Sequence, residues 1–214
     1  MTRIQLALDG DLTSSLGALH QVADLVDIVE VGTLLILREG LSTVGMARAL
    51  APNLPILADV RIAEAGGAIA RLAFDAGSTW VSMVASASAA TVKEVCRCAR
   101  EYGGEVQIEL GEEPDLRKIP MWLDEGVQHV IVHRSRDAAQ STWTAEQIDR
   151  VDELAGLGFT VTVTGGITVA EAERLTHTAA DIVIVGRGIA DAANPRSAAA
   201  EYRAAVNRES ESIR

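Results

Sequence analysis

Residues 55–64 read Pro-Ile-Leu-Ala-Asp-Val-Arg-Ile-Ala-Glu. The apolar first half of this segment predicts a buried strand, and three charged residues, Asp59, Arg61 and Glu64, follow at its carboxyl end. Burying charges so close together costs free energy unless they pair with one another or bind something. In a barrel of alternating strands and helices, the carboxyl ends of the strands are where ligands bind and reactions occur.

The rest of the chain repeats one unit, a short apolar segment followed by a longer segment with helical spacing. Many of the apolar segments are rich in Val and Ile and nearly continuous in apolar character, as in a parallel sheet covered on both faces. The strand candidates are residues 4–9, 27–33, 55–62, 79–85, 105–111, 129–135, 160–166 and 181–188.

Helix candidates separate these strands. Thr144 precedes Gln147 by three residues, which predicts a capping box at the start of one of them. The helix candidates are residues 12–25, 42–50, 64–76, 88–102, 114–125, 144–156, 168–178 and 195–209. Eight such units without a long linker predict an α/β fold, a single (β/α)8 TIM barrel domain over residues 1–214, with an open doubly wound sheet as the alternative. The charged residues 208–214 are expected to fray.

The 214 residues carry a formal net charge of −11. This acidity argues against nucleic acid or an anionic membrane as the main partner, because both are bound through basic surfaces. No stretch approaches the roughly 20 apolar residues of a membrane-spanning helix, and the N-terminal residues show no signal-peptide pattern. Cys96 and Cys98 point to different faces of a predicted helix, as expected of reduced thiols. We therefore expect a soluble, cytoplasmic protein.

Polar residues or glycines stand at the carboxyl end of nearly every predicted strand. Any one of them alone could form a salt bridge at the barrel rim, but the whole set is poorly explained in that way. The set comprises Asp9, Glu30, Asp59, Arg61, Glu109, residues 133–137, residues 164–166 and residues 186–188.

The ends of the last two strands predict a phosphate site. Gly165, Gly166, Gly186 and Gly188 would let a ligand approach the backbone and its free N–H groups, and a short helical turn is expected at residues 189–192. Loops in these two positions form the common phosphate site of such barrels. Arg187 would add a charge-assisted contact.

Glu30 and Asp59 come from neighbouring predicted strands, and their oxygen atoms suit a hard cation such as Mg²⁺. The alternative is that the two carboxylates form a salt bridge around Arg61, and the residues alone do not decide between the two. His133 stands at the end of the sixth strand. Because imidazole exchanges protons near neutral pH, His133 could act as a general acid or could orient a water molecule. Arg136 lies beside His133 in the following loop, whereas His129, at the start of the same strand, is interpreted as structural.

These motifs resemble the 3-keto-L-gulonate 6-phosphate decarboxylase and 3-hexulose-6-phosphate synthase family, within the orotidine 5′-monophosphate decarboxylase suprafamily. The resemblance covers nearly the whole chain, strand by strand. The His-Arg-Ser-Arg-Asp segment at 133–137 and the Thr-Gly-Gly segment at 164–166 resemble the decarboxylase branch. The motifs that carry it are Leu-Ala-Leu-Asp at 6–9, Val-Glu-Val-Gly-Thr at 29–33, Leu-Ala-Asp at 57–59, Val-Gln-Ile-Glu-Leu at 106–110, His-Arg-Ser-Arg-Asp at 133–137, Val-Thr-Val-Thr-Gly-Gly at 161–166 and Gly-Arg at 186–187.

The resemblance implies a lyase that decarboxylates a β-keto acid sugar phosphate through an enediolate, acting as a homodimer with active sites at the interface. It implies Mg²⁺ held by Glu30 and Asp59. Asp59, Arg61, Glu64, His133 and Arg136 would be catalytic. The implied substrate-binding residues are Asp9, Glu109 and Thr164, and the implied phosphate-binding residues are Gly166, Gly186 and Arg187.

One departure from the family stands in the third strand, where the family pattern is Asp-x-Lys-x-x-Asp with the last acid reaching across the dimer. This chain has Asp59, Arg61 and Glu64 instead. Arginine keeps the positive charge but does not give up a proton near pH 7. Two alternatives to the decarboxylase therefore stay open: a 3-hexulose-6-phosphate synthase, which joins formaldehyde to ribulose 5-phosphate, and a non-catalytic barrel that binds phosphosugars.

Overall fold

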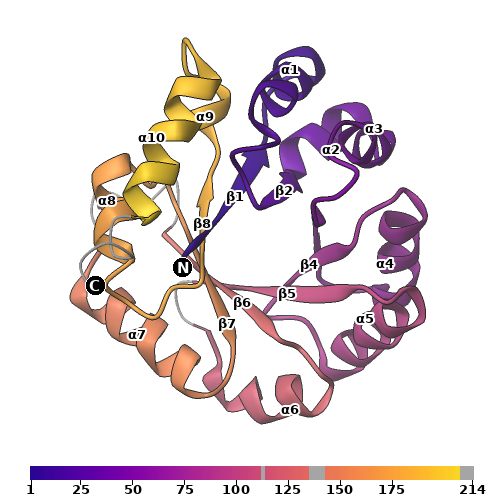
Figure 1. The fold of residues 1–214 in the computed structure, drawn as a ribbon. Coiled ribbons are helices and arrows are strands. Elements are labelled where there is room, and N and C mark those ends of the chain that lie inside the picture. The colour runs from indigo at the N-terminus through magenta and orange to yellow at the C-terminus, as the bar shows by residue number, and fades with distance from the viewer. Residues whose placement is uncertain (112–113, 135–142, 208–214) are drawn as a thin grey trace.

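Eight parallel strands close into a barrel in the order in which they occur along the chain (Figure 1). The computed structural model describes residues 1–111, 114–134 and 143–207. The last strand pairs with the first, with Arg3 opposite Ile182, so the sheet has no free edge. The closed barrel is confirmed and the open doubly wound sheet is excluded. The strands are β1 (Arg3–Leu8), β2 (Ile28–Val31), β3 (Ile56–Ile62), β4 (Trp80–Val84), β5 (Glu105–Leu110), β6 (His129–His133), β7 (Thr160–Thr164) and β8 (Ile182–Val185).

Helices surround the barrel on the outside (Figure 1). They are α1 (Leu12–Val22), α2 (Thr33–Glu39), α3 (Ser42–Leu50), α4 (Gly66–Asp75), α5 (Ala89–Tyr102), α6 (Ile119–Asp124), α7 (Ala145–Gly156), α8 (Val169–Leu175), α9 (Arg187–Ala190) and α10 (Pro195–Asn207), with a 3₁₀ turn, η1 (Leu116–Lys118), before α6. The capping box predicted at Thr144 and Gln147 is confirmed at the start of α7. The predicted fraying of residues 208–214 lies outside the described residues.

Helix α2 was not predicted, because residues 27–33 were assigned entirely to the second strand. The strand ends at Val31, and the chain turns at Gly32 into α2. A Cβ atom at Gly32 would lie 2.1 Å from Oδ1 of Asp9, so only glycine fits beside that carboxylate. The turn after β8 also begins earlier than predicted, at Arg187 rather than at residue 189.

The strands are buried on both faces, as their apolar character predicts. Their outward side chains, such as Ile4 and Leu6, join the large cluster under the helices. Inside the barrel, two small apolar clusters lie around Trp80 and Ile131. The interior also holds polar side chains that are fully buried, namely Gln5, Ser82, Gln107 and Thr162. The barrel interior is therefore a filled core, and its open spaces lie at the two ends.

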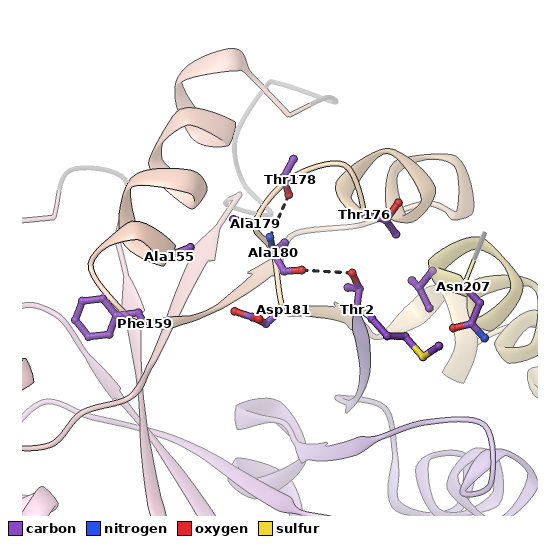
Figure 2. A pocket seen from close by; sticks show the side chains of 11 residues that line it. Thr2, Ala155, Phe159, Thr176, Thr178, Ala179, Ala180, Asp181 and Asn207 are labelled. Carbon is purple, nitrogen blue, oxygen red and sulfur yellow. Dashed lines mark hydrogen bonds between the residues drawn. The ribbon is translucent and has the colours of Figure 1, made fainter. Parts of the chain in front are cut away.

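A cavity of about 540 Å³ lies at the amino-terminal end of the barrel, which we call the floor (Figure 2). Its polar side chains hold the backbone. Asp181 Oδ2 accepts the Val161 N–H at 2.8 Å, and Thr178 Oγ1 accepts the Ala180 N–H at 3.2 Å. Its lining is otherwise mostly small and apolar, and Asp181 is its one ionisable side chain among the described residues. The floor cavity therefore lacks a group of ionisable side chains that could act together as an active site.

Candidate active site

A cavity of about 750 Å³ opens at the carboxyl ends of the strands, which we call the mouth. It brings together ten of the twelve predicted site residues. They are Asp9, Glu30, Asp59, Arg61, Glu109, His133, Thr164, Gly166, Gly186 and Arg187. Glu64 is exposed and does not line the cavity. Arg136 lies outside the described residues.

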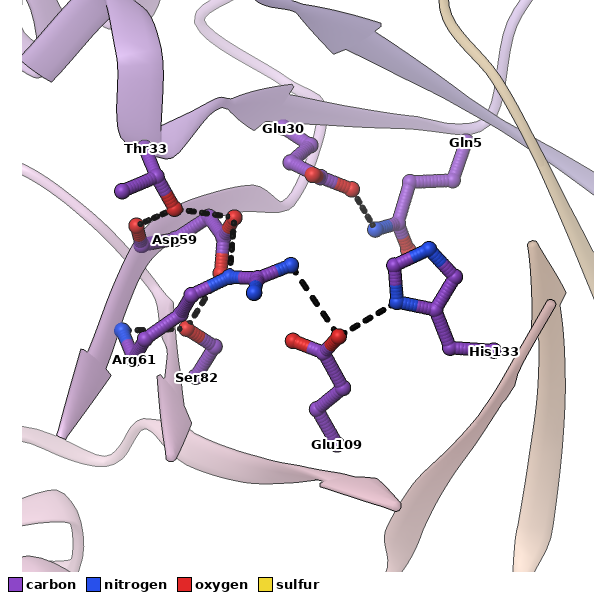
Figure 3. Close-up of polar contacts among 8 residues, drawn as sticks. All are labelled: Gln5, Glu30, Thr33, Asp59, Arg61, Ser82, Glu109 and His133. Carbon is purple, nitrogen blue, oxygen red and sulfur yellow. Dashed lines mark hydrogen bonds and ion pairs between the residues drawn. The ribbon is translucent and has the colours of Figure 1, made fainter. Parts of the chain in front are cut away.

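Glu30 and Asp59 are both buried, each with 8% of its surface exposed. Asp59 is held by two hydroxyl groups: Ser82 Oγ donates to Oδ1 at 2.6 Å, and Thr33 Oγ1 donates to Oδ2 at 2.6 Å (Figure 3). Glu30 Oε2 accepts a hydrogen bond from Gln5 Nε2 at 2.6 Å. Each carboxylate is therefore oriented by hydrogen bonds from uncharged side chains.

Burial, followed by repulsion from Asp59, raises the pKa of Glu30 from 4.5 to about 8. Asp9 and Glu109 contribute smaller repulsions in the same direction, and the hydrogen bond from Gln5 partly opposes them. Negative charge is thus concentrated at one point of the mouth. A bound cation would relieve that repulsion and would favour the ionised form of Glu30.

The donor set around this point fits a hard cation. Among the described residues, no group of three or more His, Cys, Asp or Glu side chains is placed to hold a metal ion. A complete protein cage is therefore absent from this part of the chain. Mg²⁺ usually takes one or two carboxylates and completes its shell with water and substrate oxygens. Glu30 and Asp59 would hold it in that manner.

Arg61 occupies a distorted end of β3. Its φ angle is +44°, in the left-handed region, and the pairing of β3 with β4 shifts register between Ala58 and Ile62. The Arg61 N–H donates instead to Ser82 Oγ at 2.9 Å, which is the hydroxyl that also holds Asp59. A non-glycine residue in this conformation costs on the order of 1–2 kcal/mol, and such strain tends to collect at functional sites.

The guanidinium of Arg61 lies between two carboxylates. Its Nη2 is 3.0 Å from Glu109 Oε1, and its Nε is 3.6 Å from Asp59 Oδ2 (Figure 3). Of the two sequence interpretations, the salt bridge around Arg61 forms with Asp59 and Glu109, whereas Glu30 is held by Gln5. The two interpretations are compatible, because the ion pair leaves Glu30 able to bind a cation.

His133 and Glu109 form a partly buried pair on neighbouring strands. Nδ1 of His133 lies 2.5 Å from Glu109 Oε1, the same oxygen that Arg61 contacts. Because a carboxylate accepts, Nδ1 carries the proton in this hydrogen bond. Nε2 is then left for a ligand in the mouth cavity, which His133 lines. This arrangement suits a general acid whose orientation is set by a carboxylate.

The loops after β7 and β8 lie across the mouth from Arg61 and present backbone to the cavity. Gly165 and Gly166 have φ angles of +118° and +65°, which side chains rarely allow. Gly186 and Arg187 continue the lining, and Arg187 is exposed. These four residues, from the loops after β7 and β8, together form one wall of the mouth cavity. This is where the sequence predicts a phosphate site.

Four residues of the site were missed by the sequence reasoning. Thr33 and Ser82 hold Asp59, but nothing in their own segments indicates that their hydroxyl groups meet that carboxylate. Gln5 could have been found, since it shares the inward face of the first strand with Asp9 at even spacing. Arg134 stands beside His133 but points behind the glycine loop, where its side chain contacts the carbonyl oxygen of Gly165.

Known proteins resemble this chain over almost its whole length. The model of the Orotidine 5′-phosphate decarboxylase / HUMPS family matches residues 2–202. The 3-keto-L-gulonate-6-phosphate decarboxylase UlaD of Escherichia coli O17:K52:H18 is 37% identical over 206 residues, which are 95% of each chain.

Two crystal structures are also similar. KGPDC from Streptococcus mutans, crystallised as a complex, matches with a TM-score of 0.93 and 33% identity, over 97% of this chain and 98% of that chain. A 3-hexulose-6-phosphate synthase matches with a TM-score of 0.88 and 28% identity, over 96% of this chain and 100% of that chain. The similar proteins therefore include both a decarboxylase and a synthase, the two activities within the family that the strand-end motifs resemble.

Proposed function

The chain belongs to the Orotidine 5′-phosphate decarboxylase / HUMPS family, and we propose that it is a Mg²⁺-dependent decarboxylase of 3-keto-L-gulonate 6-phosphate or a closely related β-keto acid sugar phosphate. It is an enzyme of the carbon–carbon lyase class, like the decarboxylases that it matches over 95% of its length. The alternative of a non-catalytic barrel is therefore set aside.

One observation supports this proposal above the others. A pair that can deliver a proton, His133 with Glu109, faces the same cavity as a pair of carboxylates that can hold a divalent cation, Glu30 with Asp59. Decarboxylation of a β-keto acid needs both functions. Negative charge develops when CO₂ leaves, and a carbon atom must then be protonated.

The reaction would begin with cleavage of the bond between the substrate carboxylate and the adjacent carbon. CO₂ leaves, and the electron pair moves onto the keto oxygen, which gives an enediolate. A divalent cation held by Glu30 and Asp59 would supply electrostatic stabilisation of that charge. The guanidinium of Arg61 would add to it from the other side of Asp59.

Protonation of the enediolate is assigned to His133. Arg61 does not release a proton near pH 7, so the substitution of the family's lysine leaves the imidazole as the acid in the described part of the mouth. Glu109 stabilises the imidazolium and holds its ring. Arg136 would act beside His133, as the resemblance implies. Asp9 and Thr164 would bind the hydroxyl groups of the substrate.

The test is release of CO₂ from 3-keto-L-gulonate 6-phosphate by the purified protein with Mg²⁺. Turnover that is lost in Glu30→Gln and Asp59→Asn would support the proposal. A panel of keto acid sugar phosphates without any CO₂ release would refute it.

A synthase activity is the second candidate, because a 3-hexulose-6-phosphate synthase matches the whole fold. It would add formaldehyde to ribulose 5-phosphate through a similar enediolate. The His133 and Arg136 pair resembles the decarboxylase branch, so we expect this activity to be the weaker one. Formaldehyde consumption with ribulose 5-phosphate, measured beside CO₂ release, separates the two.

We also propose that the enzyme is a homodimer with Glu64 at the interface. Glu64 is exposed just beyond β3, and the apolar side chains of Leu34 and Leu37 are exposed on α2, to 45% and 76%. Light scattering coupled to size exclusion checks the dimer, and Glu64→Ala should lower activity if the residue reaches the partner's mouth. A monomer with full activity would contradict it.

Location in the cytoplasm, and the absence of nucleic acid and membrane partners, stay predictions. No helix within the described ranges is long and apolar enough to span a bilayer.

A further inference from the structure

Arg134 is a buried cation placed directly behind the loop between β7 and α8. Only 6% of the residue is exposed, and it does not line the mouth cavity. Its Nη1 lies 2.8 Å from Glu171 Oε1, in an ion pair that is buried on both sides. Burying a charge this deeply costs free energy unless the charge is paired and its hydrogen-bond donors are satisfied. Nε and Nη2 of Arg134 face the loop.

Those donors hold two consecutive carbonyl groups of the loop. Nε of Arg134 donates to the Gly165 carbonyl at 2.8 Å, and Nη2 donates to the carbonyls of Gly165 and Gly166, the latter at 3.2 Å. The next carbonyl, that of Ile167, accepts a hydrogen bond from the hydroxyl of Tyr202 at 2.8 Å. Three carbonyls in a row are therefore fixed by buried side chains.

The orientation of these carbonyls determines where the intervening amides point. In a trans peptide the C=O of one residue and the N–H of the next point in opposite directions, and the described chain contains no cis peptide bond. The N–H groups of Gly166 and Ile167 therefore point away from the side chains that hold the carbonyls, and both residues line the mouth cavity. Within the described residues, neither amide donates to a protein acceptor. The Thr168 N–H, by contrast, is bound by Glu171 Oε2 at 3.0 Å.

The backbone of Arg134 also contacts the end of β7, where the loop begins. Its N–H donates to the Thr164 carbonyl at 3.0 Å. A Cβ atom at Gly165 would lie 2.2 Å from the carbonyl oxygen of Arg134, so the two segments approach as closely as glycine permits. The end of β6 thus fixes both His133 in the cavity and the loop beside it.

We propose that Arg134 is a positioning residue for the phosphate group, acting through the amides of Gly166 and Ile167. It holds their carbonyl neighbours so that both N–H groups are oriented for a phosphate before the ligand arrives. Two preoriented amides and the exposed Arg187 would together bind the phosphate dianion of the substrate. This inference rests on the proposed function, which places the phosphate in the same wall of the mouth.

The variant Arg134→Lys separates orientation from charge. Lysine keeps the positive charge but lacks the planar fork that reaches two carbonyls and Glu171 together. Calorimetry with inorganic phosphate should show a dissociation constant raised by roughly tenfold or more. The KM for the sugar phosphate should rise similarly, with kcat at saturation changed by less than about threefold. Affinity equal to that of the wild type in the folded variant would overturn the proposal.

Arg203→Lys is the matched control. Arg203 makes the same kind of contacts far from the mouth, with Nε and Nη2 donating to the Leu25 carbonyl and Nη2 to Asp27. It should lose stability comparably without a change in phosphate affinity. An equal loss of phosphate affinity in both variants would mean that general destabilisation, not the loop, is responsible, and would also overturn the proposal.

A measurement on the wild type can overturn the proposal even if Arg134→Lys does not fold. Titration of the ¹⁵N-labelled protein with inorganic phosphate should shift the amide resonances of Gly166 and Ile167. Shifts confined to Gly186 and Arg187 would overturn the role of Arg134 while leaving the proposed phosphate site in place. No shift in either loop would instead contradict the phosphate site of the proposed function.

Discussion

Strands β5 and β6 carry the same histidine–glutamate pair twice, once at each end of the barrel. His133 contacts Glu109 at the mouth, and four residues earlier on each strand His129 contacts Glu105 at the floor. The two pairs have the same residue types and are made between the same two strands. They differ in the ring nitrogen that contacts the carboxylate, Nδ1 in His133 and Nε2 in His129, and in their surroundings.

The histidine of the floor pair is enclosed, whereas its partner Glu105 is partly exposed. His129 is 4% exposed, and its ring centroid lies 4.5 Å from that of Trp80. Burial lowers the pKa of His129 despite the opposing influence of Glu105. The mouth pair instead faces the cavity that holds Glu30 and Asp59. A histidine paired with a carboxylate is therefore a candidate acid only where a substrate and a charge centre can meet it.

The largest effect is expected from Glu30 and Asp59, a pair of carboxylates that has no counterpart in the lining of the floor cavity. Asp59→Asn keeps the shape of the side chain but removes the charge needed for a cation. We expect kcat/KM to fall by roughly a thousandfold or more. Asp181→Asn at the floor is the control. Its side-chain oxygen still accepts the Val161 N–H, so activity should stay within about twofold, since only a surface charge is lost.

Exchanging each histidine for glutamine tests the comparison directly. His133→Gln should lower kcat by roughly 100- to 10,000-fold, because the acid is lost. His129→Gln should leave kcat within about threefold but lower the free energy of unfolding by about 1–3 kcal/mol. Steady-state kinetics and denaturant unfolding give the two numbers. Equal kinetic losses in two stably folded variants would break the distinction between mouth and floor.

The pH dependence of cation binding should report the crowding of charge at the mouth. With a pKa of about 8, Glu30 must lose a proton when Mg²⁺ binds. Affinity should therefore rise nearly tenfold per pH unit from pH 6 toward 8 and then level off. Calorimetry in buffers of different ionisation enthalpy measures the released proton, and a flat profile would contradict the assignment of Glu30.

The same shift determines how the stability of the metal-free protein depends on pH. The pKa of Glu30 is higher in the folded state than its ordinary value of 4.5, so the unfolded chain loses this proton first. Rising pH between about 4.5 and 8 therefore reduces the stability of the folded protein, and Mg²⁺ should restore it.

Gln5→Met should weaken Mg²⁺ binding, because the Gln5 hydrogen bond favours the ionised form of Glu30. Gln107→Met, which removes a bond to Thr162 instead, is the matched control.

The smallest effect is expected when Arg61 is exchanged for another cation. Arg61→Lys restores the residue of the family pattern and keeps a cation near Asp59 and Glu109. We expect kcat to change by less than about tenfold, whereas Arg61→Met should cost roughly a hundredfold because charge stabilisation is lost. If Arg61→Lys instead raises turnover by several orders of magnitude, the arginine is an impairment rather than a working substitute.

Much of this architecture could be predicted from local patterns. Continuous apolar segments ending in Asp9, Glu30, Asp59 or Glu109 placed the strands and their functional ends. The prediction failed where tertiary contacts override local preference. Helix α2 follows β2 directly, because Gly32 must pass beside the Asp9 carboxylate. Arg61 adopts a left-handed conformation, because the Ser82 hydroxyl takes the place of a strand partner. Neither contact has a signal in its own segment.

Local patterns along the chain predict the barrel and ten of the residues that line the mouth, because polar residues at the ends of apolar strands gather at one end of a barrel. The contacts among these residues are set by the folded barrel. It paired Arg61 with Glu109 and not with Glu30, separated His133 from His129 by environment, and left Glu64 outside the cavity. It also turned Arg134 behind the glycine loop. These outcomes depend on distances between strands and loops far apart in the chain, which residue spacing does not encode.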